Sequence, residues 1–316
     1  MNKKVLGIVI AAAVVLVGGA FYLKNGDKVG SGNNGGAVEV THKLGTTALE
    51  KTPERVVVLD YGALDILDNL GVNIVGVPKS GKLPEYMNKY SAEEYANVGT
   101  VKEPDLEAIH ALNPDVIVMA GRMEDYYKQF TEIAPTVFFN ADGADYLNSY
   151  ENNLNMLGKL FGLEKETDKM LKEVTSKIEE ANKEITKLNL NATSIMLNGR
   201  NISAFNKSSR YGLLFNELGF KQTDEGLEDS THGQEVSYEY LVEKNPEYLF
   251  VVDRNAITGT ETGSSAKEII ENELVKQTKA YKDGNIVYLN SVNWYTVSGG
   301  YTSTLGMVNE VLEAIK

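Results

Sequence analysis

The sequence predicts an α/β protein of two similar lobes with mainly parallel central sheets, joined by a single long rigid helix, with a ligand cleft between the lobes. The first observation is an internal repeat, since residues 104–122 (PDLEAIHALNPDVIVMAGR) align without a gap with residues 236–254 (VSYEYLVEKNPEYLFVVDR). The second is an alternation of strand and helix patterns, which is typical of a parallel sheet with helices on both faces. The third is a long charged helical pattern at 164–188, which separates the two repeats.

The repeat defines one α/β unit. Each copy has an early Glu, a helical stretch, an Asn-Pro pair that ends the helix, an apolar strand, and an Arg at the end of that strand. Ligands of open α/β sheets bind beyond the carboxyl ends of the strands, where both arginines are expected. Two copies of this unit therefore favour a two-lobed binder of an anionic ligand.

The elements of the first half follow from hydrophobic periodicity. A β-branched strand at 56–59 leads into a helical pattern at 61–70, which stops at Gly71. Further strands are expected at 72–77, 116–119 and 137–139, and further helices at 106–112 and 126–133.

The middle of the chain is helical. Leu154, Leu157 and Phe161 mark one amphipathic helix that Gly162 closes, and apolar residues then recur at spacings of three and four over 164–188. The second helix would be roughly 37 Å long, which suits a strut between lobes, although an ordinary surface helix fits the pattern equally well. In the second half we expect strands at 195–197, 248–252 and 286–289, and helices at 211–219, which echoes 61–71, and at 302–315.

These patterns divide the chain into five segments. They are 1–23, a signal or membrane-anchor segment; 24–37, a flexible linker; 38–145, an N-terminal α/β lobe; 146–190, a connecting helical segment; and 191–316, a C-terminal α/β lobe.

Composition limits the classes of function. The formal net charge of -13 argues against nucleic acid as a partner, and the absence of Cys excludes disulfides, thiolate metal sites and cysteine nucleophiles. Lysine carries most of the positive charge. Because Arg grips oxyanions in a fixed, bidentate way, each of the few arginines is a candidate anion ligand. They are Arg55, Arg122, Arg200, Arg210 and Arg254.

The N-terminus predicts export. Residues 1–4 are a short basic start, and residues 5–23 carry no charge. A signal-peptide core has about 7–15 apolar residues and a spanning helix about 20, so this segment targets a membrane, either cleaved near residues 18–20 or retained as an anchor. Residues 24–36 (KNGDKVGSGNNGG) are typical of a flexible tether. We expect the rest of the chain at the outer face of the cytoplasmic membrane.

No enzyme signature is present. The sequence has no phosphate-binding Walker loop, no HExxH pair, no nucleophile elbow and no dinucleotide glycine fingerprint. Only three His residues occur, which argues against a dedicated multi-His metal site.

Three arginines are placed to face one crevice. Arg122 and Arg254 follow equivalent strands, and Arg210 lies at the start of the helix after a strand of the second half, where the helix N-terminus also favours anions. Three guanidinium groups around one crevice suit a ligand of charge about minus three. Taken singly, each fits a surface or salt-bridge arginine as well.

Aromatic and histidine residues add candidates. Trp294 and Tyr295 form an aromatic loop after a strand, which can wall a flat ligand or simply pack, and a Tyr phenolate suits Fe(III). His232 lies in a polar loop, where it can be a ligand or a solvated side chain. We assign packing or surface roles to His110 and no role to His42.

The chain resembles class III (helical-backbone) substrate-binding proteins of ABC importers for ferric siderophores, nearest to the petrobactin/enterochelin-type catecholate binders. The resemblance covers about residues 40–316, with two Rossmann-like lobes. The segments that carry it are VVVLDYGALDILDNLG, VGTVKEPDLEAIHALNPDVIVMAGR, KSSRYGLLFNELGF, HGQEVSYEYLVEKNPEYLFVVDRN and NWYTVSGG.

The resemblance implies the roles of the site residues. An arginine triad that binds a ferric catecholate falls on Arg122, Arg210 and Arg254. A His and a Tyr that complete the iron shell, when a tetradentate bis-catecholate leaves two positions open, fall on His232 and Tyr295. The iron is carried in the siderophore, so no intrinsic cofactor is implied.

It also implies partners. One exposed Glu on each lobe docks onto arginines of the permease, which here implies Glu107 and Glu239; each fits an exposed helix residue equally well. The partners are then the ABC permease and its ATPase, together with the membrane through the N-terminal segment, and we expect a monomer. One feature departs from the family: Leu16-Val17-Gly18 begins a passable lipobox, but Gly19 stands where the lipidated Cys is required, so we expect no lipidation.

Other readings stay open. The same fold could bind haem, a cobamide or a hydroxamate siderophore; the arginines weigh against neutral trihydroxamates, whereas the propionates of haem could use them. A more remote reading is a metal-dependent enzyme or metallochaperone with His232 and Tyr295 as its site.

Overall fold

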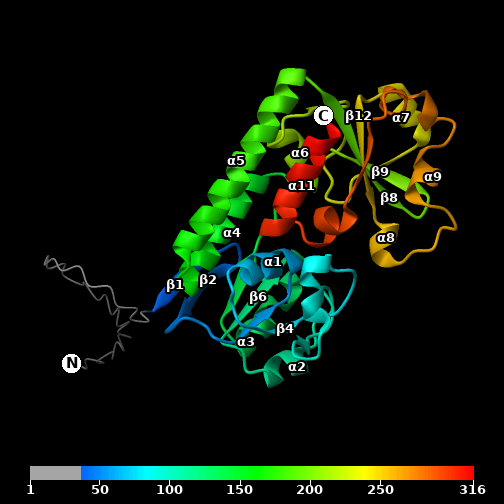
Figure 1. Cartoon of the computed structure of the whole chain (residues 1–316). Coiled ribbons are helices and arrows are strands. Elements are labelled where there is room, and N and C mark those ends of the chain that lie inside the picture. The colour runs from blue at the N-terminus through cyan, green and yellow to red at the C-terminus, as the bar shows by residue number, and fades with distance from the viewer. Residues whose placement is uncertain (1–36) are drawn as a thin grey trace, which may run out of the picture. The chain divides into compact units, whose positions relative to one another are not determined.

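The computed structural model describes residues 37–316 (Figure 1). The predicted segment 1–23 and the linker up to residue 36 lie outside the described residues. Within 37–316, no helix is long and apolar enough to cross a membrane.

The first lobe is built on five parallel strands in the order β5-β4-β3-β6-β7. The strands are β3 (Val56–Val58), β4 (Ile74–Val77), β5 (Ala96–Asn97), β6 (Val116–Ala120) and β7 (Thr136–Phe139). The connecting helices are α1 (Tyr61–Asn69), η1 (Glu85–Ser91), α2 (Leu106–Ala111), η2 (Gly121–Tyr126) and α3 (Tyr127–Ile133).

The central strands of this sheet are buried on both faces. In β6, Val116 and Val118 enter one apolar core, whereas Ile117 and Met119 enter another on the opposite face. This alternation follows from the two-residue period of a strand. Burial on both faces explains why the sequences of these strands are continuous apolar runs.

An N-terminal hairpin, which the sequence did not predict, packs on this lobe. Its strands β1 (Val38–His42) and β2 (Gly45–Leu49) pair antiparallel and contact β7, and β1 also contacts α4. Lys43 and Leu44 form the two-residue turn between them.

The second lobe has a mixed six-stranded sheet. The order is β11-β9-β8-β12-β13, with β10 also paired to β8. Strands β8, β10, β12 and β13 run parallel, whereas β9 and β11 are antiparallel to their neighbours. The strands are β8 (Asn191–Asn198), β9 (Asn201–Phe205), β10 (Lys221–Gln222), β11 (Gln234–Val236), β12 (Tyr248–Asp253) and β13 (Ile286–Leu289).

The antiparallel part arises from a tight hairpin between β8 and β9. Gly199 is the first residue of its two-residue turn and has a φ of 62°, which glycine adopts without steric cost. The Asn198-Gly199 pair is a hairpin signal that the periodicity alone does not reveal.

The helices of the second lobe are mostly short. They are α6 (Leu213–Asn216), α7 (Tyr238–Lys244), α8 (Asn255–Thr258), α9 (Ala266–Ile270), η3 (Val275–Gln277), α10 (Lys279–Lys282), the π-helix η4 (Val292–Thr296) and α11 (Tyr301–Ala314). The helix expected at 211–219 is only four residues long. At its end, the side-chain amide of Asn216 donates to the carbonyls of Lys207 and Ala144 and ties this segment to two loops.

The internal repeat is confirmed as a structural repeat. The first copy forms α2 and β6, and the second forms α7 and β12, each at the matching positions. Asn113 and Asn245, the residues before the two matching prolines, both adopt left-handed conformations with φ of 44° and 47°. Asn tolerates this conformation better than most residues, so the pair ends both helices in the same way.

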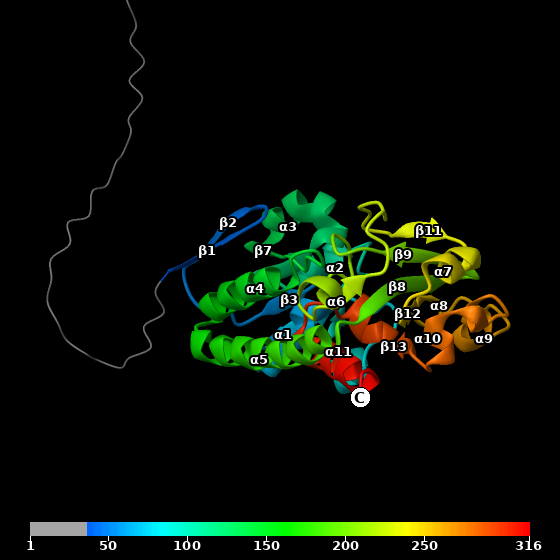
Figure 2. The same cartoon turned by 90° about the horizontal axis from the view of Figure 1, so that it is seen from above.

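Two long helices connect the lobes. They are α4 (Tyr146–Phe161) and α5 (Glu164–Leu188), which pack side by side as Figures 1 and 2 show, and α5 also packs on α11. Gly162 joins them with a φ of 66°. The bounds of α5 are those predicted for the linking helix, and its apolar stripe, which includes Val174, Ile178 and Ile185, is buried. The division of the chain into domains at 145 and 190 remains a prediction.

The lobes also meet directly where α1 approaches α11. The buried carboxylate of Asp65 accepts a hydrogen bond from the backbone N–H of Ser303 at 2.9 Å, and the side chain of Asn69 donates to Thr302 Oγ1 at 3.0 Å. A Cβ on Gly62 would lie 2.5 Å from the carbonyl oxygen of Ser298, so glycine is required for this approach.

Candidate ligand-binding site

A cavity of about 510 Å³ lies between the two lobes. The first lobe contributes Lys43, Asp60, Ala120–Arg122 and Phe138–Ala144, and the second contributes Ser208–Arg210, Thr231, Trp294–Thr296 and Ser298. The first-lobe set includes the residues that follow strands β6 and β7, and the second-lobe set includes residues of the π-helix η4, which follows β13. This is the position expected for a crevice at strand ends.

Arg122 reaches this cavity from the end of β6. The strand is buried up to Met119, and the chain then turns into η2 with Arg122 exposed. Its Nη2 donates to the backbone carbonyl of Tyr295 at 3.4 Å, and its guanidinium lies 5.6 Å from the centre of the Tyr295 ring.

Arg254 approaches the same tyrosine from the end of β12. Its Nη1 donates to the side-chain oxygen of Asn198 at 2.7 Å, which fixes the guanidinium against the neighbouring strand β8. Its Nε donates to the hydroxyl of Tyr295 at 3.3 Å. Arg254 thus contacts Tyr295, although it is not among the residues that line the cavity.

The structure positions Arg210 differently from the sequence prediction. It follows β9, which runs antiparallel, and it precedes α6, whose four residues offer no helix N-terminus of the expected kind. Its guanidinium nevertheless lies 4.4 Å from the centre of the Tyr295 ring. A Cβ on Gly143, in the chain that enters α4, would lie 2.5 Å from the carbonyl oxygen of Arg210, so this crossing holds the arginine in the cavity.

The π-helix η4 presents two aromatic side chains in opposite ways. Trp294 is buried, and its indole N–H donates to Glu310 Oε2 at 2.9 Å. Tyr295 is half-buried at the meeting point of the three arginines. Single π-turns are rare in proteins, and those that occur are often found at functional sites. Here the turn places the buried Trp294 beside the half-buried Tyr295.

The arginines change the acidity of Tyr295. Burial alone raises the pKa of the phenol, but the hydrogen bond from Arg254 and the charges of Arg210, Arg254 and Arg122 outweigh it, so the pKa lies below its ordinary value. A phenol that ionises more readily is a better oxygen donor to Fe(III).

Asp60 places a carboxyl group at the cavity. It caps α1 by accepting from the backbone N–H groups of Gly62 and Ala63 at 2.8 and 3.1 Å. Burial raises the pKa of this carboxyl, against the opposing effects of the Ala63 hydrogen bond and the Arg122 charge. The sequence offered a signal for it, since Asp60 directly follows the apolar run 56–59.

His232 is not placed with the arginines. It is exposed, and its neighbour Thr231 lines the cavity while His232 does not. Among residues 37–316, no group of three or more His, Cys, Asp and Glu side chains is arranged to hold a metal ion.

Glu107 and Glu239 occupy matching exposed positions. Each lies in the first turn of its repeat helix, after an N-cap whose side chain accepts a backbone N–H, namely Asp105 in α2 and Ser237 in α7. The two glutamates are therefore equivalent surface points on the two lobes.

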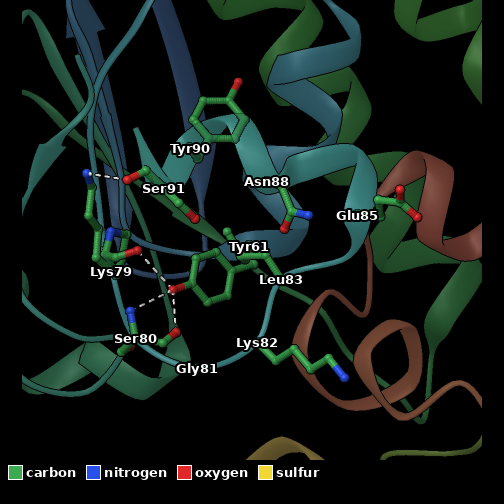
Figure 3. Close-up of a pocket in the computed structure, with 11 residues that line it drawn as sticks. Tyr61, Lys79, Ser80, Gly81, Lys82, Leu83, Glu85, Asn88, Tyr90 and Ser91 are labelled. Atoms are coloured by element: carbon green, nitrogen blue, oxygen red, sulfur yellow. Dashed lines mark hydrogen bonds between the residues drawn. The ribbon is translucent and has the colours of Figure 1, made fainter. Parts of the chain in front are cut away.

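A second cavity, of about 740 Å³, lies beside α1 in the first lobe (Figure 3). Its wall is held by the hydroxyl of Tyr61, which lies 2.9 Å from the Pro78 carbonyl and accepts from the backbone N–H of Ser80 at 3.3 Å. Two lysines line this cavity, namely Lys79, whose ammonium donates to the carbonyl of Ala92 at 2.7 Å, and Lys82. No arginine lines this cavity, which leaves the interlobe cavity as the candidate anion site.

Comparison with known proteins places the chain in a family. The family described as "Periplasmic binding protein" matches residues 56–292, which include both repeats and η4 up to its first residue. The chain belongs to this family. Its members bind solutes and do no chemistry on them, so the chain is a binding protein and not an enzyme.

Similar proteins agree with this assignment. The petrobactin-binding protein YclQ of Bacillus subtilis (strain 168) is 39% identical over 318 residues, covering 99% of each chain. Its crystal structure has a TM-score of 0.85 at 40% identity, over 89% of this chain and 99% of that one. The catecholate-siderophore binding protein VctP of Vibrio cholerae has a TM-score of 0.84 at 35% identity, over 88% of this chain and 100% of that one. The ferric-anguibactin-binding protein FatB of Vibrio anguillarum is 30% identical over 284 residues, covering 87% of each chain.

These findings confirm the predicted family and fold class. The α/β architecture with two lobes and a linking helix α5 is the architecture of these structures.

Proposed function

We propose that this chain captures a ferric catecholate siderophore outside the cytoplasm and delivers it to an ABC importer for iron uptake. The observation that carries the proposal is the convergence of Arg122, Arg210 and Arg254 on Tyr295 at one interlobe cavity. The ligands named for the similar proteins, petrobactin, ferric anguibactin and catecholate siderophores, support it.

The binding mechanism is electrostatic and geometric. The guanidinium groups offset the negative charge of the ferric complex and donate charge-assisted hydrogen bonds to the catechol oxygens. These donors lie on two lobes, so a bound ligand bridges the lobes. The linking helix α5 limits how far the two lobes move relative to each other. The iron is cargo within the ligand, and the protein supplies no cofactor.

Tyr295 has a second role when the siderophore is tetradentate. Two catechols leave two iron positions open, and the phenol oxygen, whose pKa the arginines lower, fills one of them. His232 fills the other after the exposed turn that holds it moves toward the cavity; Thr231, next to it, already lines the cavity.

The loaded protein then docks on the membrane permease through Glu107 and Glu239, which pair with arginines of the permease. The two glutamates lie at equivalent exposed positions on the two lobes. The ATPase of the importer drives release and transport. The protein acts as a monomer at the outer face of the membrane, held by the apolar segment 5–23 or released after its cleavage, without a lipid because the chain has no Cys.

Calorimetric titration of the full chain with a ferric catecholate tests the arginine roles. Truncating one partner of a desolvated charge pair costs about 2–5 kcal/mol, so Arg210→Ala weakens binding by about 30-fold or more. Arg200→Ala, on the exposed β8–β9 turn outside the cavity, leaves affinity unchanged and is the matched control. Equal affinities for wild type and Arg210→Ala would remove the basis of the proposal.

The docking role of the two glutamates can be tested separately from ligand binding. Glu107→Ala and Glu239→Ala keep wild-type affinity for the ligand but lose stimulation of the importer ATPase in reconstituted vesicles. Glu243→Ala, an exposed glutamate on the same helix α7, retains stimulation. Full stimulation by the double Glu107→Ala, Glu239→Ala variant would exclude these docking points.

A further inference from the structure

Lys43 brings a further cation, besides Arg122 and Arg210, to the lining of the interlobe cavity from an unexpected source. It lies in the turn between β1 and β2 and lines the cavity together with Arg122 and Arg210. Its ammonium lies 5.3 Å from the centre of the Phe138 ring, which also lines the cavity, and 3.1 Å from Glu124 Oε2.

The turn that presents Lys43 is braced by His42. The backbone N–H of Leu44 donates to His42 Nδ1 at 3.3 Å, so the ring proton resides on Nε2, which lies 3.0 Å from Thr47 Oγ1. Thr47 in turn donates its hydroxyl proton to the Thr136 carbonyl in β7 at 2.5 Å. The hydroxyl therefore accepts from the imidazole, and each proton in this chain of bonds has one acceptor.

The brace joins the hairpin to the wall of the cavity. Thr136 begins β7, whose last residues and following loop form the wall from Phe138 to Ala144. The rings of His42 and Tyr127 also pack in a T-shaped pair, with ring centres 5.9 Å apart. The position of Lys43 is thus set by the same strand that shapes the cavity.

The partner of Lys43 holds it only weakly. Glu124 lies in η2, the short helix that carries Arg122, and is not among the residues that line the cavity. The side chains of Lys43 and Glu124 are 54% and 43% exposed, and an ion pair of that kind contributes little. An anion bound inside the cavity, with less water around it, attracts the same ammonium more strongly.

We propose that Lys43 is a further ligand-binding residue, which exchanges Glu124 for an anionic oxygen of the ferric siderophore and favours the more highly charged complexes. The inference rests on the proposed function and deepens it, because it assigns part of the charge selectivity to the N-terminal hairpin. The added charge of Lys43 contributes most for a ferric tris-catecholate of charge minus three and least for a ferric bis-catecholate of charge minus one.

The test is a titration of the full chain and its variants with both ferric complexes at low and high salt. Lys43→Gln weakens binding of the tris-catecholate by about tenfold and that of the bis-catecholate by a smaller factor, and it reduces the salt dependence. Lys43→Arg, which keeps the charge, stays near wild type. Lys128→Gln, an exposed lysine of α3 outside the cavity, is the control for net charge.

Glu124 supplies a second, independent variant. Glu124→Gln frees Lys43, so it tightens tris-catecholate binding in the wild-type background and has a smaller effect in the Lys43→Gln background. Equal effects in the two backgrounds would mean that Glu124 merely repels the ligand and would overturn the exchange.

The outcomes separate this inference from the proposed function. If Arg210→Ala weakens binding while Lys43→Gln binds both complexes as wild type does, the inference fails and the proposed function stands. A Lys43→Gln variant that loses thermal stability at unchanged affinity would show that Lys43 only holds the hairpin. If the wild-type chain binds neither complex, both fail together.

Discussion

Gly143 offers a sharp test of how the fold positions Arg210. The chain that leaves β7 crosses the turn of Arg210 at this residue, and the two backbones touch. A Cβ built on Gly143 would lie 2.5 Å from the Arg210 carbonyl oxygen and 2.6 Å from its Cα. Gly143→Ala therefore cannot be accommodated by a side-chain rotation, since every nearest atom belongs to the backbone.

The size of the effect follows from these distances. Non-bonded carbon atoms normally lie about 3.5–4.0 Å apart, so the two segments must separate by about 1 Å. Overpacking of this kind costs about 1–3 kcal/mol, and each kcal/mol lowers Tm by about 2–4 °C in a chain of comparable size. Binding groups must be held within about 0.5 Å, so we expect the affinity for a ferric catecholate to fall by about tenfold or more.

Differential scanning calorimetry and ligand titration on the same samples measure both effects. Gly121→Ala is the matched control, because Gly121 lines the same cavity next to Arg122 and a Cβ there would approach only the Phe138 ring, at 3.9 Å. It should leave Tm close to wild type. A Gly143→Ala variant with wild-type Tm and affinity would refute the claim that this crossing fixes Arg210.

Two further predictions concern ionisable groups. Arg254→Met removes the hydrogen bond and one of the charges that lower the pKa of Tyr295, so we expect that pKa to rise. Ultraviolet titration, with Tyr295→Phe variants subtracted to isolate the signal of this phenol, measures the change. An unchanged pKa would contradict the effect of Arg254 on Tyr295. Burial raises the pKa of Glu217 from 4.5 to about 7, so the folded state holds this proton more tightly than the unfolded state. The stability associated with this proton is complete below pH 4.5 and is lost as pH rises through about 7. Relative to wild type, Glu217→Gln should thus gain stability across this window in urea denaturation, and a pH-independent difference would contradict the shift.

Much of the fold followed from the sequence because the relevant signals are local. The repeat predicted α2, β6, α7 and β12 at matching positions, since an Asn-Pro pair ends a helix and a β-branched run forms a buried strand whatever lies around them. Arg122 and Arg254 could be placed at matching strand ends because they immediately follow such strands, and both contact Tyr295.

The rest depends on contacts between distant segments. The sequence placed Arg210 at a helix N-terminus, whereas the structure positions it by the Gly143 crossing, which no local pattern encodes. The hairpin that carries Lys43 has strands of only five residues and was missed, and the role of His42 depends on Thr136, which lies far along the chain. The π-turn of η4 was expected only as an aromatic loop, because no periodicity marks a single π-turn.

The central claim is that the three-arginine cavity binds a ferric catecholate, and fluorescence titration of the full chain tests it most directly. Trp294 is the only Trp and lines the cavity beside Tyr295, so an absorbing ferric complex bound there quenches its emission. The ligands to compare are a ferric bis-catecholate, a ferric tris-catecholate, a neutral ferric trihydroxamate and haem.

We predict tight quenching by the catecholates, with a charge-transfer band of the bis-catecholate complex that changes in Tyr295→Phe. Tight binding of the trihydroxamate or haem, with no binding of either catecholate, would contradict the account.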